Sequence, residues 1–119
     1  MASEAPKNIR VSDRANEIMD NLKLEGFFAD NAAAYRTAIF VAISHNLSLE
    51  NTPSTPNNKW DTSSIFRNSD SNIESILALL FPQEDVIPYG CKLAEAGLAW
   101  LDQQRLEGCN VLELLNPTK

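Results

Sequence analysis

The sequence NAAAYRTAIFVAISHNL, residues 31–47, predicts the helix around which the fold is organised. Between Tyr35 and Ile43, only Arg36 and Thr37 interrupt the apolar residues. A helix that is apolar on all sides must be buried on all sides. In a chain of 119 residues, one domain covers one face of such a helix and has little left to cover the other. We therefore expect a second copy of the protein to cover the other face of this helix, in an obligate homodimer or higher oligomer.

Length and composition fit one domain, because a hydrophobic content of 44% supports a modest core in a chain of this size. The N-terminus, MASEAPKNIR, lacks the apolar segment of a signal peptide, and no apolar stretch is long enough to span a bilayer. We expect a cytoplasmic protein with no membrane partner. Cys91 and Cys109 have no CxxC spacing and are expected to be free thiols.

The chain divides into a disordered lead, residues 1–6, and a single domain, residues 7–119. Within the domain, an N-terminal part (7–47) precedes a polar loop (48–72) and a set of C-terminal helices (73–119). The loop is rich in Asn, Ser, Thr and Pro and is long for a compact domain. Its large apolar residues, which we expect to pin it to the surface, are Trp60, Ile65 and Phe66.

The segment KNIRVS, residues 7–12, alternates apolar and polar side chains and predicts a short strand. No second strand-like run of comparable clarity is present in the sequence. Because a lone strand cannot satisfy its backbone, we expect it to pair antiparallel with the same strand of another subunit about a two-fold axis. The candidate oligomer interface therefore comprises Ile9, Val11, Tyr35, Ile39, Phe40 and Ile43.

Two capped helices are predicted to follow the strand. Ser12 is a suitable N-cap for a helix to about Leu24, and Gly26 a suitable stop. Asp30 or Asn31 can cap the central helix. The first helix carries one apolar stripe at helical spacing, formed by Ala15, Ile18, Met19 and Leu22.

The C-terminal part predicts a helix over about 72–81, capped by Ser71 or Asn72, and a longer helix over about 91–104. In the longer helix, Gly97 would allow another helix to approach closely. An apolar tail at 111–115 is expected to dock within the chain or across subunits. The inward face of the shorter helix is predicted to be Ile73, Ile76, Leu77 and Leu80.

The sequence contains no motif for catalysis or for nucleotide binding. His45 is the only histidine, and one histidine with two distant cysteines does not make a zinc ligand set. We expect no metal, no cofactor and no enzymatic activity. Trp60 and Trp100 are expected to anchor a core or an interface, the alternative being stacking on bases.

The order of strand IRVS, helix, glycine-containing turn and YRTAI helix resembles the ribbon-helix-helix superfamily over residues 7–47. The matching features are Ile9 and Val11 facing inward and an Arg-x-Ala-Ile run that follows Tyr35. The resemblance implies a mainly helical fold whose N-terminal part forms an intermolecular two-stranded antiparallel ribbon, followed by C-terminal helices.

In that superfamily, the outward strand residues lie in the major groove of DNA. The resemblance implies this role for Asn8, Arg10 and Ser12, with Lys7 on a phosphate, and makes double-stranded DNA the candidate partner. The chemistry fits, because Arg can hold guanine bidentately and Asn can hydrogen-bond adenine. The alternative is that these side chains are only the solvated face of the ribbon, since a net charge of −6 leaves few cations for phosphates.

The segment LAEAGLAWL, residues 93–101, together with this element order is similar to the small DndE-type subunit of DNA sulfur-modification systems. That likeness implies an oligomer that associates with DNA. Leu93 and Ala96 stand where basic or imidazole groups are expected. We expect a DNA-associated oligomeric regulator or accessory subunit without catalytic activity. The alternative is an acidic oligomeric protein-interaction module that does not bind DNA.

Overall fold

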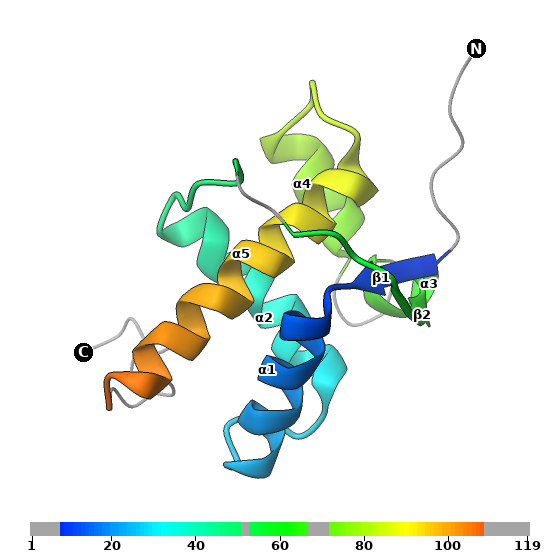
Figure 1. The fold of residues 1–119 in the computed structure, drawn as a ribbon. Helices are drawn as coiled ribbons and strands as arrows, with labels where there is room; N and C mark the ends of the chain where they lie inside the picture. The colour runs from blue at the N-terminus through cyan, green and yellow to red at the C-terminus, as the bar shows by residue number, and fades with distance from the viewer. Residues whose placement is uncertain (1–7, 51–52, 67–71, 109–119) are drawn as a thin grey trace.

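Two long helices, α2 (Asn31–Ser44) and α5 (Val86–Leu106), lie against each other and form the most extensive contact between elements (Figure 1). The computed structural model describes residues 8–50, 53–66 and 72–108. The other elements are β1 (Asn8–Val11), α1 (Asp13–Leu24), β2 (Asn57–Asp61), α3 (Thr62–Phe66) and α4 (Ile73–Leu80). The described part is mainly helical with a two-stranded antiparallel sheet, which confirms the coarse fold class.

Helix α1 forms where its local signals place it. The Ser12 hydroxyl accepts a hydrogen bond from the Ala15 N–H at 3.0 Å, which satisfies one of the free donors of the first turn. The predicted apolar stripe is buried. Gly26 follows the helix with a φ of +81°, a left-handed conformation that glycine adopts without strain. These observations confirm the predicted cap, stripe and stop.

Helix α2 is capped by Asp30, whose Oδ1 accepts from the Ala33 N–H at 2.8 Å. Tyr35, Ala38 and Ile39 are fully buried, as the apolar pattern predicted. Helices α1 and α5 of the same chain cover them. The expectation that a second copy must cover the other face of α2 is therefore wrong, because the C-terminal helix α5 of the same chain covers it.

The contact between α2 and α5 is closest at Gly97. A Cβ atom placed on Gly97 would lie only 1.9 Å from the carbonyl oxygen of Ala38. Real Cβ atoms do not approach backbone oxygens this closely, so only glycine fits here. The expectation that Gly97 permits a close helix approach is confirmed.

Strand β1 pairs antiparallel with β2 of its own chain, with Ile9 opposite Trp60 and Arg10 opposite Asn58. A bulge between Ile9 and Arg10 accommodates the extra residue Lys59. This pairing corrects the expectation that the chain offers no partner for its first strand. It also corrects the description of residues 48–72 as a loop, because β2 and α3 lie within them.

The sequence of β2 hides its strand character. NNKWD has no alternation of apolar and polar residues, and only Trp60 has a large apolar side chain. Trp60 packs edge-on against Tyr35 of α2, with ring centroids 5.1 Å apart. The side-chain amide of Asn57 donates to the Val11 carbonyl at 3.1 Å. Contacts with distant residues, rather than a local pattern, hold this strand.

The C-terminal helices differ in two ways from the prediction. Helix α5 begins at Val86 rather than near Cys91, because Pro88 lies in the first turn, where its missing N–H needs no partner. Helix α4, capped by Asn72, buries Ile73 and Leu77 as predicted. Ile76 and Leu80 of the predicted inward face are instead exposed, because only one narrow face of this short helix meets α5 and α3.

Several predicted features lie outside the described residues: the lead 1–6, the apolar tail 111–115, Ser71 and Cys109. Among the described helices, none combines the length and apolar character needed to cross a membrane.

Candidate nucleic-acid interface

The outer side of the β1–β2 sheet is polar. Asn8 and Arg10 of β1 are exposed, and their register partners, Asp61 and Asn58 of β2, are exposed as well. We call these four residues the ribbon face. The alternate residues Ile9 and Val11 are fully buried beneath it. The strand alternation thus presents two amides, one guanidinium and one carboxylate to solvent.

The structure supports the outward placement of two of the predicted DNA-contacting residues and contradicts a third. Asn8 and Arg10 point outward, whereas Lys7 lies outside the described residues. Ser12 is buried, and both its N–H and its hydroxyl donate to the carboxylate of Glu95, at 3.1 and 2.6 Å. Ser12 therefore has no free group for DNA, because it serves the cap of α1 and the contact with α5.

Glu95 is a buried, hydrogen-bonded acidic residue that the sequence analysis did not identify as a candidate functional residue. It lies on the buried side of α5 and closes the junction between β1 and α1 from across the molecule. Burial raises the pKa of this carboxyl, while the two hydrogen bonds from Ser12 oppose that rise. Its only signal in the sequence is a single acidic residue within the otherwise apolar run LAEAGLAWL.

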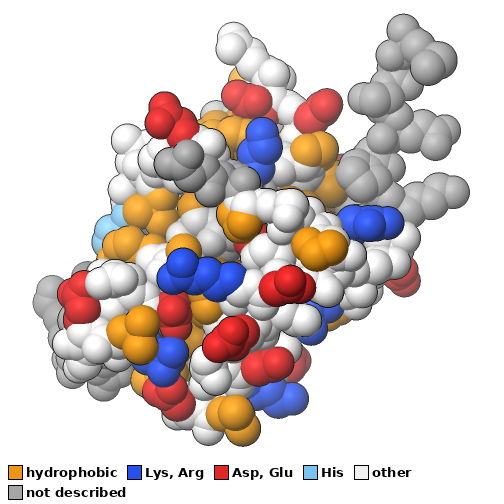
Figure 2. Space-filling view, viewed as in Figure 1, with side chains coloured by type: hydrophobic (Ala, Val, Ile, Leu, Met, Phe, Trp, Pro, Cys, Tyr) orange, Lys and Arg blue, Asp and Glu red, His pale blue; other side chains and the backbone are white. Residues whose placement is uncertain are grey.

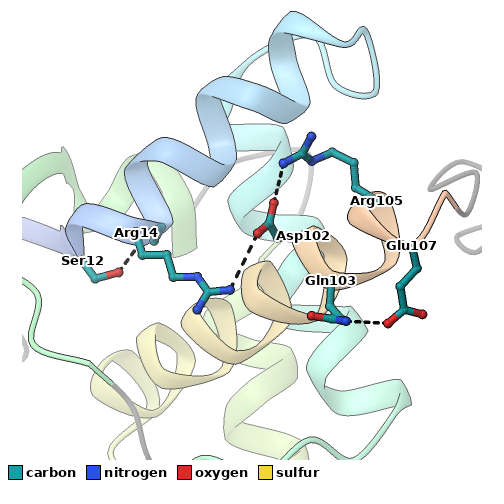
Figure 3. A network of polar contacts seen from close by, with 7 residues as sticks. Ser12, Arg14, Asp102, Gln103, Arg105 and Glu107 are labelled. Atoms are coloured by element: carbon teal, nitrogen blue, oxygen red, sulfur yellow. Dashed lines mark hydrogen bonds and ion pairs between the residues drawn. The ribbon is translucent and has the colours of Figure 1, made fainter.

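A polar network joins the C-terminal half of α5 to α1 (Figure 3). Asp102 accepts a hydrogen bond from Arg105 Nη2 at 2.8 Å and lies 3.7 Å from Arg14 Nη2. Arg105 Nη1 also donates to Glu25 Oε2 at 2.6 Å. The hydrogen bond to Asp102 raises the pKa of Arg105. These arginines are neutralised by carboxylates, so the network ties helices together rather than offering free cations to phosphate.

A pocket of about 420 Å³ lies beside this network. Its polar edge is formed by Arg14, Glu95 and Gln103, and its apolar wall includes Leu47 and Trp100. The pocket combines one cation with one carboxylate, so its electrostatics favour neither a cationic nor an anionic ligand.

His45, the single histidine, stacks on Trp100 with ring centroids 4.3 Å apart. The aromatic rings therefore pack on each other, as expected for a structural histidine. Figure 2 shows acidic and basic side chains interspersed over the visible face, with no broad basic patch.

The predicted oligomer interface is mostly interior. Ile9, Val11, Tyr35 and Ile39 have no exposed surface in the single chain. The chain's own packing therefore uses the apolar area that was assigned to a partner copy. Phe40, which is 36% exposed, and the half-buried Ile43 are the two members that a second copy could reach.

Two nucleophile-type side chains lie next to each other. The fully buried Tyr35 lies beside the free thiol Cys91, which is partly buried. Burial raises the pKa of Cys91 and of Tyr35. Because a raised pKa keeps both groups protonated at neutral pH, neither is an activated nucleophile.

Within residues 8–50, 53–66 and 72–108, no three His, Cys, Asp or Glu side chains are grouped so that they could hold a metal ion. A comparison of the chain with models of protein families, with curated proteins and with solved structures found no match.

Proposed function

We propose that this protein is a DNA-associated accessory subunit without catalytic activity, whose ribbon face meets the DNA. The observation that carries the proposal is the exposed set Asn8, Arg10 and Asn58 on one face of an antiparallel two-stranded ribbon. A ribbon of this width fits the major groove. Arginine can bind the O6 and N7 atoms of guanine, and asparagine can bind N6 and N7 of adenine.

The charges of the ribbon face predict modest affinity for a single chain. Arg10 is its one cation, and Asp61 opposes it with one negative charge. The neighbouring Lys59 is half-buried and donates to Asn16 Oδ1 at 2.6 Å. Because each neutralised phosphate adds to affinity through counterion release, one copy gains little. Several copies in a homodimer or higher oligomer would add their contacts, so self-association is part of this proposal.

An intermolecular ribbon would have to be built differently from the expected one. Strand β1 already pairs with β2, so a second copy must either displace β2 or add to an outer edge of the existing pair. The resemblance to ribbon-helix-helix proteins supports this proposal through the order strand, helix, turn and helix at the N-terminus. We further propose that the protein acts in the cytoplasm.

The test is fluorescence anisotropy of a labelled DNA duplex, titrated with the protein from low to near-physiological salt. We expect Arg10→Ala to weaken binding and to lower the slope of log affinity against log salt by about 1. Lys23→Ala removes the same charge at the far end of α1 and should change affinity little. Absence of binding at low salt would refute the proposal, as would equal losses from both variants.

The second candidate function is an acidic protein-interaction module that does not bind DNA. The observation that favours it is the exposed apolar side of α4, where Ile76, Leu79 and Leu80 face solvent on a chain of net charge −6. Under this candidate, Arg10→Glu leaves function unchanged, whereas changes on α4 remove it. The anisotropy titration separates the two candidates.

A further inference from the structure

We propose that the exposed side of α4 docks an amphipathic helix of a different, basic protein. We call its three residues, Ile76, Leu79 and Leu80, the α4 ridge. This inference gives the second candidate function a surface and a partner class. It does not depend on DNA binding by the ribbon face, and it also holds if the protein does both.

The ridge is a continuous stripe rather than a scatter of apolar side chains. Positions 76, 79 and 80 are spaced i, i+3 and i+4, so the three side chains are neighbours on one side of the helix. Their exposed fractions are 38%, 82% and 50%. Isolated exposed leucines are common on protein surfaces, but a contiguous apolar stripe is typical of an interaction site.

Buried residues next to the ridge hold it in place. Ile73 and Leu77, on the adjoining side of α4, are fully buried. Leu77 reaches the surface of α5 at Gly90, where an added Cβ would lie 2.9 Å from Leu77 Cδ1 and 2.5 Å from the Phe66 ring. This close seating fixes the rotation of α4 about its axis. The ridge is therefore preformed, and a partner does not have to order it first.

The charge beside the ridge determines what kind of partner fits. The turn that follows α4 carries the exposed carboxylates Glu84 and Asp85, and the negative end of the α4 dipole points toward it. These two acids line a surface pocket of about 600 Å³, whose lining includes a single cation, Lys92. A helix with leucines at helical spacing and flanking lysines or arginines matches both the ridge and this acidic turn.

A second copy of this chain matches the ridge less well. Two-fold packing of ridge on ridge with the two α4 helices parallel would bring Glu84 and Asp85 of each copy toward the acidic turn of the other. Each copy also carries a net charge of −6. Like-charge juxtaposition costs free energy and selects against this pairing. The charges therefore favour a basic partner over self-association at this surface.

The experiment uses the full chain and two labelled synthetic peptides with leucines at the same helical spacing, one with lysines between them and one with glutamates. Binding is measured by fluorescence anisotropy. We expect the Leu/Lys peptide to bind and the Leu/Glu peptide not to bind. Leu79→Ser should weaken binding roughly tenfold, because a well-buried leucine side chain contributes about that much to affinity.

The chain supplies matched controls. Leu24 at the end of α1 is 83% exposed, almost the same as Leu79, and lies outside the ridge, so Leu24→Ser should leave peptide affinity unchanged. Glu84→Lys should weaken binding several-fold, whereas Glu17→Lys, which makes the same charge change on α1, should have a smaller effect. Circular dichroism of each variant checks that it folds.

Three results would overturn the proposal. The first is no binding of the Leu/Lys peptide, and the second is equal loss from Leu79→Ser and Leu24→Ser. The third is a wild-type dimer in size-exclusion chromatography that Leu79→Ser converts to a monomer, which would make a second copy the occupant. Arg10→Ala should leave peptide binding intact, so failure here is distinguishable from failure of the DNA proposal.

Discussion

Replacing Gly97 with alanine tests whether the contact between α2 and α5 organises the fold. The new methyl group would lie 1.9 Å from the Ala38 carbonyl oxygen, which belongs to a helix backbone and cannot rotate away. Helices α2 and α5 must therefore separate, and the loss of close packing spreads along their shared interface. The same substitution at Gly90 meets only side-chain atoms of Phe66 and Leu77, which can shift.

The magnitude follows from two opposing effects. Overpacking a core costs about 1–3 kcal/mol, and a clash with backbone belongs at the upper end of that range. Alanine gains about 1 kcal/mol over glycine in a helix interior. The net loss in the free energy of unfolding at Gly97 is thus about 2 kcal/mol, or a fall in Tm of about 8 °C for a domain of this size. Gly90→Ala should lower the free energy of unfolding by less than half as much as Gly97→Ala.

The measurement is urea unfolding and thermal unfolding of the wild type, Gly97→Ala and Gly90→Ala, followed by circular dichroism at the helix band. The m value should stay constant if the fold is kept. A Gly97→Ala variant that is as stable as the wild type would refute the reasoning, because the propensity gain would then have met no clash. Equal losses at both glycines would refute the distinction between backbone and side-chain contacts.

Three further outcomes are expected. Ser12→Ala should lower the free energy of unfolding by about 2–4 kcal/mol, because it removes both the N-cap and the hydrogen bond to the buried Glu95, with the exposed Ser44→Ala as control in the same thermal melts. The raised pKa of Glu95 means that the native state holds its proton more tightly than the unfolded state, so this group's contribution to stability falls as the pH rises from its usual value near 4.5 through the native pKa. Glu95→Gln keeps hydrogen-bond partners for Ser12 and should remove this pH-dependent fall in stability, measured by urea titrations over a pH series. If the pH profile of stability is unchanged in Glu95→Gln, Glu95 is not the group that causes the fall. Phe40→Asp should leave the fold intact and reduce the oligomer size measured by light scattering if Phe40 contacts a second copy, whereas Ile39→Asp places a charge in the core and should unfold the chain.

The features that the sequence predicts correctly are those that neighbouring residues determine. Ser12 and Asp30 cap helices through hydrogen bonds to residues three positions on. The burial of α2 follows from its lack of a polar face. What the sequence does not determine is which surface buries α2. That depends on α5, more than forty residues later in the chain, and on the single small residue Gly97 that lets it approach.

The missed features depend on contacts between distant residues. Strand β2 has no alternating pattern, and it is a strand because β1 and Tyr35 lie beside it. Ser12 looks like an outward strand residue, yet the carboxylate of Glu95 binds it from α5. For the candidate site, alternation correctly places Asn8 and Arg10 on the outer face. It cannot reveal Asn58 and Asp61 opposite them.

The hydrogen bond between Ser12 and Glu95 joins residues 83 positions apart, and this separation has a consequence during synthesis. At about 5–20 residues per second, a ribosome needs roughly 4–17 s to add the residues between them. Until then, the N-terminal strand has emerged without the carboxylate that closes its junction, and for part of that time without β2. A nascent chain that ends after α2 thus has β1, α1 and α2 but not the residues that pair with its first strand and cover it. The surface proposed to meet DNA therefore requires β2 as well as β1, and the contact that closes its junction with α1 requires α5.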